Sequence, residues 1–201
     1  MSEPVLRTRV RPVAPTEVRL IVAVMDRESL RGKRDAAIIL LGNAGALRAG
    51  ELAALSRPDV KFTRAGLRLT VRGRPVELAA VADPELDPVT ALKAWLKAAR
   101  IERGAIFRPV AAPGLRTNRD RMSAQAVSAV VAARGGAAGV AGVTGLSLRA
   151  GYVTTAKAEG VEQLDIDRFL RVAGVRPRQQ RQALRQTAGP QRPSQPTRSP
   201  S

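Results

Sequence analysis

The stretch RDAAIILLGNAGALRAGELAAL, residues 34–55, decides the fold. Its apolar first half, its glycines at 42 and 45 and its second apolar run predict a helix, a Gly-Asn-Ala-Gly turn and a second short helix. Arg48 lies at the junction, with Glu51 on the same helical face. Helix N-termini and Gly-rich turns expose backbone N–H groups, so an arginine here is well placed to bind phosphate. A surface ion pair between Arg48 and Glu51, which stabilises little, is the alternative interpretation.

The composition limits the chemistry that the chain can perform. Its 201 residues are 44% apolar, which is enough for one domain with a core. Cysteine and histidine are both absent, which excludes disulfides, thiolate metal sites and every mechanism that uses a histidine base. We therefore expect no metal site and no cofactor.

The charge indicates a polyanionic partner. The chain has 34 basic and 17 acidic residues, a net charge of +17, which most simply predicts DNA or RNA binding. Twenty-nine of the basic residues are Arg, so coding bias contributes, but bias does not explain why no acid follows Asp167 while eight arginines do. No apolar run of 18 residues and no signal peptide occur, so we expect a cytoplasmic, nucleoid-associated protein without a membrane partner.

The periodicity predicts a mostly helical α+β domain with a small antiparallel sheet. Residues 1–15 resemble an extended basic arm, and Thr16 is a candidate N-cap for a helix over 17–26, followed by a polar link over 27–33. Strands are predicted over 59–63, 67–71 and 75–80, because apolar and polar residues alternate there and Gly66 and Gly73 supply turns. Further helices are predicted over 88–100, from Ser123 to 133, from Ser147 to 159 and over 162–172, separated by a basic loop (111–121) and a Gly-rich segment (134–145).

Two motifs resemble the catalytic domain of tyrosine recombinases, the phage integrase family. The first is Arg34-Asp35 followed by Ala-Leu-Arg-Ala-Gly-Glu-Leu over 46–52, then Leu55 and Asp59-Val60. The second is Leu-Ser-Leu-Arg-Ala-Gly-Tyr-Val-Thr over 146–154. The resemblance covers residues 12–186, and it implies a basic arm (1–15), a catalytic-like domain (16–186) and a disordered basic tail (187–201).

The resemblance implies that Arg48 and Arg149 grip the scissile phosphate, but it also shows losses. The family histidine falls at Leu146, its second His or Trp at Val175 and its nucleophilic Tyr at Leu184. Its hairpin lysine, which protonates the leaving oxygen, is replaced by arginines, which are poor proton donors. No intact catalytic set is therefore expected. The expected phosphate contacts are Arg48, Arg149, Arg72, Arg74, Arg116, Arg119, Arg121, Arg176 and Arg178.

Tyr152 is the one tyrosine of the chain, and it matches an aromatic position of the family. We predict that it packs in the core with its hydroxyl hydrogen bonded, rather than acting as a nucleophile. The family carries a separate helical domain before the catalytic one. Only about fifteen residues precede the first predicted helix here, so we expect a weaker and less selective grip on DNA, made through phosphates.

Three hypotheses for function remain open. The first is a catalytically inactive relative of tyrosine recombinases that binds duplex DNA and acts in recombination or integration, or in their regulation. The second is an interaction protein that docks on an active recombinase, or self-associates, through its C-terminal segment. The third is an active enzyme whose nucleophile is Tyr152 or comes from a partner. An unrelated basic helical domain is the remaining alternative.

Overall fold

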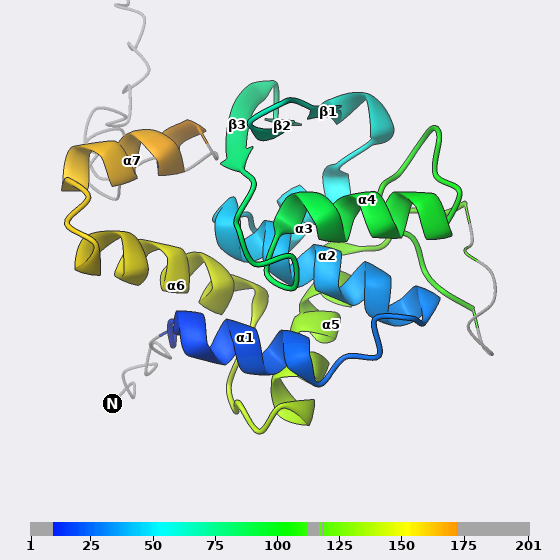
Figure 1. The fold of residues 1–201 in the computed structure, drawn as a ribbon, viewed down its shortest axis with the longest axis horizontal. Coiled ribbons are helices and arrows are strands. Elements are labelled where there is room, and N and C mark those ends of the chain that lie inside the picture. The colour runs from blue at the N-terminus through cyan, green and yellow to red at the C-terminus, as the bar shows by residue number, and fades with distance from the viewer. Residues whose placement is uncertain (1–9, 112–116, 118, 173–201) are drawn as a thin grey trace, which may run out of the picture.

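The computed structural model describes residues 10–111, 117 and 119–172. Helix α2 lies at the centre of the fold, and α1, α3, α4, α5 and α6 all pack against it (Figure 1). The sheet lies above α2 and α4 in this view, and α7 turns back from α6 to touch β3. The elements are α1 (Pro15–Ala23), α2 (Leu30–Ala44), α3 (Ala49–Ala54), the 3-10 helix η1 (Arg57–Asp59), β1 (Val60–Phe62), β2 (Gly66–Val71), β3 (Arg74–Ala79), α4 (Pro88–Ala98), α5 (Ala124–Ala137), α6 (Gly145–Ala158) and α7 (Gln163–Val172).

The mostly helical α+β architecture and its small sheet confirm the predicted fold class. The strands are antiparallel in the order β1-β2-β3, with Leu69 paired to Val60 on one side and to Val76 on the other. These three side chains are buried, so one face of the sheet covers the core and the other faces solvent. Arg72 and Gly73 form the β2–β3 turn with φ of 52° and 76°, the combination that a two-residue hairpin turn requires.

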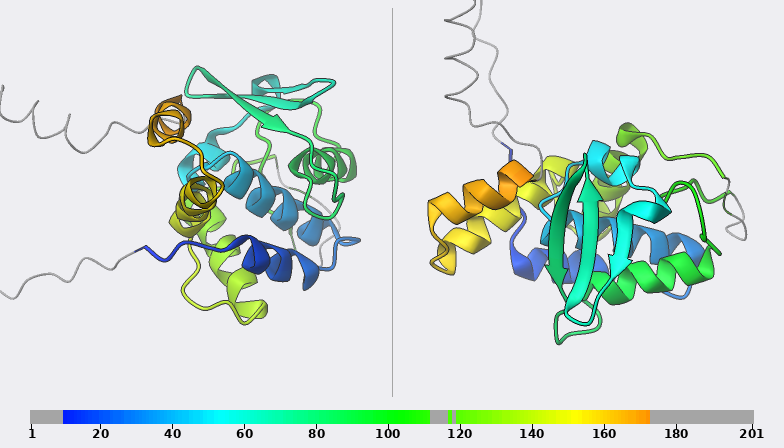
Figure 2. Two further views of the ribbon diagram at one scale, coloured as in Figure 1. Left: turned by 60° about the vertical axis from the view of Figure 1, so that its left-hand side comes forward. Right: turned by 90° about the horizontal axis from the view of Figure 1, so that it is seen from above.

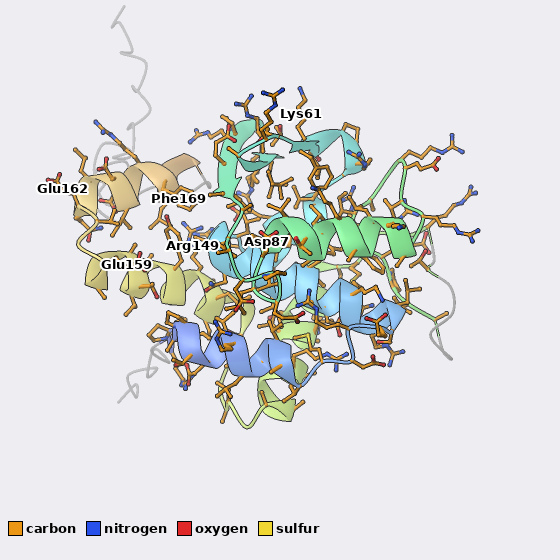
Figure 3. The ribbon with its side chains drawn as sticks, viewed as in Figure 1. Lys61, Asp87, Arg149, Glu159, Glu162 and Phe169 are labelled. Carbon is orange, nitrogen blue, oxygen red and sulfur yellow. The ribbon has the colours of Figure 1, made fainter. Side chains whose placement is uncertain are left out.

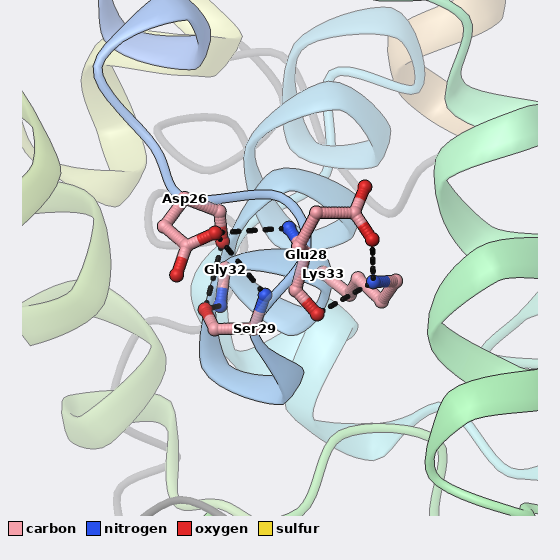
Figure 4. Close-up of polar contacts among 5 residues, drawn as sticks. All are labelled: Asp26, Glu28, Ser29, Gly32 and Lys33. Atoms are coloured by element: carbon pink, nitrogen blue, oxygen red, sulfur yellow. Dashed lines mark hydrogen bonds and ion pairs between the residues drawn. The ribbon is translucent and has the colours of Figure 1, made fainter.

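Ser29 caps the start of α2 (Figure 4). Its Oγ accepts a hydrogen bond from the Gly32 N–H at 3.0 Å and donates one to the Asp26 carbonyl oxygen at 2.7 Å. A Cβ on Gly32 would lie 1.9 Å from that carbonyl oxygen, so a side chain there would force the two segments apart. The polar link predicted over 27–33 is shorter than expected: residues 27–29 form it, and the helix already begins at Leu30, with the following polar residues in its first turn.

The end of α2 also differs from the prediction. The turn expected over 42–45 is wrong, because the helix continues through Ala44 and the chain turns at Gly45 and Ala46, where Ala46 has a φ of 47°. Gly42 serves helix packing instead. A Cβ at Gly42 would lie 2.9 Å from the Leu148 Cδ1, so the glycine lets α6 approach α2 closely. The second short helix, α3, is confirmed.

Helix α4 forms as predicted. The Asp87 carboxylate accepts hydrogen bonds from the N–H groups of Val89 and Thr90. Burial alone would raise the pKa of Asp87, but these bonds and one from the Thr90 hydroxyl outweigh it and lower that pKa. Trp95 is a core residue: it is fully buried, and its Nε1 donates to the Ile106 carbonyl oxygen at 3.0 Å.

Three helix boundaries differ from the predictions. Helix α1 begins at Pro15 after Ala14, rather than after Thr16, because Pro is favoured in the first turn. Helix α5 runs on to Ala137, through part of the segment expected to bend. Helix α6 begins after Thr144, and Ser147 lies inside its first turn, where its Oγ accepts the Thr144 N–H at 3.0 Å.

The segment before α1 packs against α6. Val13 is buried, and its N–H donates to the Ser147 carbonyl oxygen at 3.2 Å. A Cβ on Gly151 would lie 2.2 Å from the Val13 carbonyl oxygen, so this glycine makes room for the segment. Within the described ranges, no helix is long and apolar enough to cross a membrane.

Candidate phosphate-binding site

Arg48 is the N-cap residue of α3, and its backbone is held by Glu51. The Arg48 N–H donates to the Glu51 Oε2 at 2.8 Å, and the Glu51 side chain is buried. The spacing of three residues between Arg48 and Glu51 is therefore that of a helix N-cap, in which the Glu51 carboxylate accepts the backbone N–H of the N-cap residue. The Arg48 Nε is buried without a hydrogen-bond partner in the described part of the chain. An unsatisfied buried donor costs about 1–3 kcal/mol, so the folded state would gain from an acceptor that the Arg48 side chain could reach.

Arg149 lies on α6 and reaches the turn that precedes α3 (Figure 3). Its Nη1 donates to the Ala46 carbonyl oxygen at 2.6 Å, and its Nη2 lies 3.5 Å from the Leu170 carbonyl oxygen of α7. Burial and the neighbouring Arg48 both lower the pKa of Arg149, while Glu51 opposes them. The two arginines of the sequence motifs, which are 101 residues apart in the chain, therefore lie next to each other.

Arg72 joins this cluster from the β2–β3 turn. Its Nε lies 3.8 Å from the Glu51 Oε1, and its side chain is 61% exposed while that of Glu51 is fully buried. The Glu51 Oε1 accepts no hydrogen bond within the described residues. One carboxylate thus lies near three arginines: it is 3.8 Å from the Arg72 side chain, acts electrostatically on Arg149 and binds the Arg48 backbone. This leaves an excess of positive charge that a phosphate would neutralise. We call Arg48, Glu51, Arg72 and Arg149 the arginine cluster.

From the sequence we predicted Arg48, Arg72 and Arg149 as phosphate contacts, and Glu51 only as a possible ion-pair partner of Arg48. The signal for its structural role was the capping spacing, in which an acidic residue stands three positions after the N-cap. Arg74 is exposed at the start of β3, two residues from Arg72. A cavity of about 270 Å³ lies between α3 and the β2–β3 turn, with Glu51 and Arg72 in its wall.

Two other expected contacts lie elsewhere. The Arg121 guanidinium donates to the carbonyl oxygens of Ala53 at 2.5 Å and Leu55 at 3.0 Å, and to the Ser56 Oγ at 2.7 Å. It therefore caps the C-terminal end of α3, opposite Arg48. Arg119 is exposed and lies near Arg108 rather than near the cluster. Arg116, Arg176 and Arg178 lie outside the described residues, as do the ends of the domain and tail expected at 186 and 187–201.

The positions where the family has its remaining catalytic groups can be placed only in part. Leu146 is 50% exposed in the first turn of α6; Val175 and Leu184 lie outside the described residues. Tyr152 does not pack in the core as predicted: it is half-buried, and its ring stacks on Phe169 of α7 at 4.8 Å between ring centres. Its hydroxyl makes no hydrogen bond within the described part, and burial raises its pKa.

Three solved structures share this fold. The crystal structure of XerA recombinase matches with a TM-score of 0.61 and 17% identity, covering 95% of this chain and 70% of that chain. An integrase from mycobacterium phage Brujita matches with a TM-score of 0.59 and 21% identity over 91% and 58%. XerH site-specific recombinase, bound to its difH substrate, matches with a TM-score of 0.57 and 14% identity over 92% and 57%. The fold is that of the tyrosine recombinase catalytic domain.

A sequence comparison adds to the match in fold. The chain is 33% identical over 172 residues to an integrase/recombinase xerD homolog from Selenomonas ruminantium, a match that takes in 80% of this chain and 50% of that protein. The chain thus spans about half the length of this curated relative. No protein-family model matches the sequence. This relative, the shared fold and both arginine motifs support the tyrosine recombinase family for this chain.

Proposed function

We propose that the protein binds duplex DNA through the arginine cluster and acts in DNA recombination or integration without cleaving DNA itself. The buried, unpartnered Nε of Arg48 is the observation that carries this proposal. The neighbouring Arg149 is buried, and the Glu51 carboxylate offsets only part of the positive charge of the group. Phosphate oxygens, like carboxylates, match the geometry of guanidinium groups and bind them in paired hydrogen bonds.

The family relationship supports DNA as the source of that phosphate. In its solved structure, XerH site-specific recombinase is bound to its difH substrate in a pre-cleavage complex. The net charge of +17 favours a nucleic-acid partner for this chain as well. Contacts to phosphates alone give affinity without sequence choice, so we expect weak discrimination between sequences.

We infer the lack of cleavage from the side chains at the positions where the family has its catalytic groups. Cleavage in this chemistry needs a nucleophile in line with the phosphorus and a proton for the leaving oxygen. Leu146, Val175 and Leu184 offer no nucleophile and no proton. Tyr152 is the one tyrosine of the sequence, and stacking on Phe169 occupies its ring. Arg48 and Arg149 supply charge stabilisation only.

Duplex binding across a salt series tests the first half of the proposal. Affinity should fall steeply with salt, with a slope of about 0.9 per phosphate contact. Arg48→Gln should weaken binding by about ten- to a hundredfold, because a hydrogen bond to a charged group contributes about 1.5–3 kcal/mol. The matched control is Arg64→Gln, which removes an exposed charge from the turn between β1 and β2. Equal affinity of the two variants would contradict the role of the cluster.

A nicked suicide substrate tests the second half, because it traps any covalent protein–DNA adduct. We expect none from the protein alone. An adduct that disappears in Tyr152→Phe would show an active enzyme with an unexpected nucleophile. An adduct that forms only after a full-length recombinase is added, and that includes this chain, would show that a partner supplies the missing groups.

Docking on an active recombinase, or on a second copy of this chain, is the second candidate function. The observation that favours it is the pair of apolar side chains at the connection between α6 and α7, where Val161 is 42% and Leu164 52% exposed. The C-terminal segment through which we expected this docking lies beyond the described residues. DNA binding that appears only in the presence of an active recombinase would favour this function over the first.

A further inference from the structure

A second basic surface lies along α4 and the loop that follows it, apart from the arginine cluster. Lys93 and Lys97 share one face of α4 at i and i+4, and Arg100 follows two residues after the helix ends at Ala98. All three are exposed, and they line a cavity of about 520 Å³ whose wall also includes Phe62 of β1. Like charges four residues apart destabilise a helix slightly, so the repulsion within this stripe of basic residues opposes folding.

The stripe continues into a second cavity of about 350 Å³. Arg100 and Glu102 line both cavities, so the two are adjacent. Glu102 is the one acid among the described residues that line either of them. We call the basic residues that line the two cavities from α4 onward the α4 basic surface: Lys93, Lys97, Arg100, Arg103, Arg108 and Arg119.

Arg108 is held in position before any ligand arrives. Its Nε donates to the Ala105 carbonyl oxygen at 2.8 Å, and its Nη2 donates to the Arg103 carbonyl oxygen. Burial and the nearby Arg119 lower the pKa of Arg108. Within the described ranges, none of the six basic side chains of this surface forms an ion pair. A fixed guanidinium among unneutralised cations is the arrangement that an anion stabilises.

The two basic regions face different directions. Seen from above (Figure 2, right), the β2–β3 turn that carries Arg72 lies at the end of the sheet next to α3, whereas α4 lies at the opposite end. In Figure 1, α4 runs away from α6 toward the opposite edge of the molecule, where residues 100–108 follow it. The α4 basic surface is therefore separate from the arginine cluster, and a stiff duplex would have to run along the sheet to contact both.

We propose that the α4 basic surface is a second nucleic-acid site, which binds the phosphate backbone of a separate duplex while the arginine cluster holds the first. This proposal presupposes the DNA binding proposed above and adds a second duplex to it. Double-stranded nucleic acid fits better than single strands, because Lys93 lies over the ring of Phe62 at 5.3 Å and leaves that face unavailable for base stacking. The protein would thus join two duplexes through a single domain.

A bridging assay tests the proposal. A short duplex is fixed on beads and saturated with the full chain, and capture of a second, fluorescent duplex of the same length is measured. Arg103→Gln/Arg119→Gln should reduce capture at least tenfold. Each phosphate contact multiplies the binding constant by the molar salt concentration to the power of about −0.9, and this variant loses two contacts. Its retention on the first duplex should change no more than in the matched control Lys61→Gln/Arg64→Gln, which removes two exposed charges from the sheet.

The outcomes separate this proposal from the one on which it rests. If the wild type holds the fixed duplex but captures no second one, or if the paired variants behave alike, the second site is refuted and the arginine cluster is unaffected. If the α4 variant loses affinity only for one long duplex, the surface holds flanking DNA and the separate duplex is refuted. If the wild type holds no duplex at all, while still folded, both proposals fail.

Discussion

Replacing Glu51 by Gln removes the one negative charge of the arginine cluster while keeping the size of the side chain. The Glu51 Oε2 accepts the Arg48 N–H at 2.8 Å, and a neutral acceptor weakens such a bond by about 1 kcal/mol. The repulsion between Arg48 and Arg149 then lacks its offset. Glu51 makes no direct ion pair with the buried Arg149 among the described residues, so this loss is smaller than the cost of a broken buried pair, which is about 3–5 kcal/mol. Solvent screens the contribution of Arg72, whose side chain is 61% exposed. A neutral amide costs less free energy to bury than a carboxylate, which opposes both effects. We therefore expect a net loss of about 2 kcal/mol in unfolding free energy.

Urea denaturation at neutral pH measures this loss. The matched control is Glu77→Gln, which makes the same chemical change on the exposed side of β3, where Glu77 pairs with Arg68 at 2.5 Å. Exposed pairs contribute about 0–1 kcal/mol, so the control should stay near the wild type. Added sulfate should narrow the gap between the two variants, because an anion in the cluster replaces part of the lost charge. A Glu51→Gln variant as stable as Glu77→Gln would refute the view that Glu51 offsets the arginines.

Three single contacts lead to further predictions. Gly42→Ala should cost about 1–3 kcal/mol in urea denaturation, because its Cβ would meet the Leu148 side chain at 2.9 Å in a packed core. Arg121→Ala should cost about 1–3 kcal/mol by leaving carbonyls at the end of α3 without a donor, with duplex affinity nearly unchanged in a binding assay. The lowered pKa of Asp87 contributes stability that is present above its unfolded pKa of about 3.9 and is lost as the pH falls through the folded pKa. Asp87→Ala should therefore be less stable at pH 7 by about 1 kcal/mol, and acid titration of both proteins should show the gap closing at low pH.

The sequence predicted most elements of the fold because their patterns are local. Alternation over 67–71 indicated β2, and Asp87 followed by Pro indicated the start of α4. The predictions failed where distant contacts override local preference. Gly42 and Gly135 lie inside helices, although glycine disfavours helices, because a Cβ at either would press on a side chain of another segment at 2.9 and 2.8 Å.

The site divides in the same way. The motifs predicted that Arg48 and Arg149 act together, and the fold brings them together. Sequence alone did not indicate that Arg121 caps α3, since the bonds join residues 66 and 68 positions apart. Nor did it indicate that Arg108, anchored by two carbonyl oxygens, lies beside Arg119. Such pairings depend on where loops pack against helices that are distant in the sequence. No local sequence pattern indicates these contacts.

The two arginines of the cluster are not equivalent, and the difference bears on what their presence means. Arg149 donates to the Ala46 carbonyl oxygen and approaches that of Leu170, so it ties α6 to the turn before α3 and to α7. A residue with such structural bonds is needed for folding whether or not a phosphate is bound. Arg48 has a buried Nε with no partner in the described part of the chain, which is a cost to the folded state. A bound ligand would account for the unpartnered nitrogen of Arg48. Loss of the Arg48 side chain should therefore weaken DNA binding without weakening the fold.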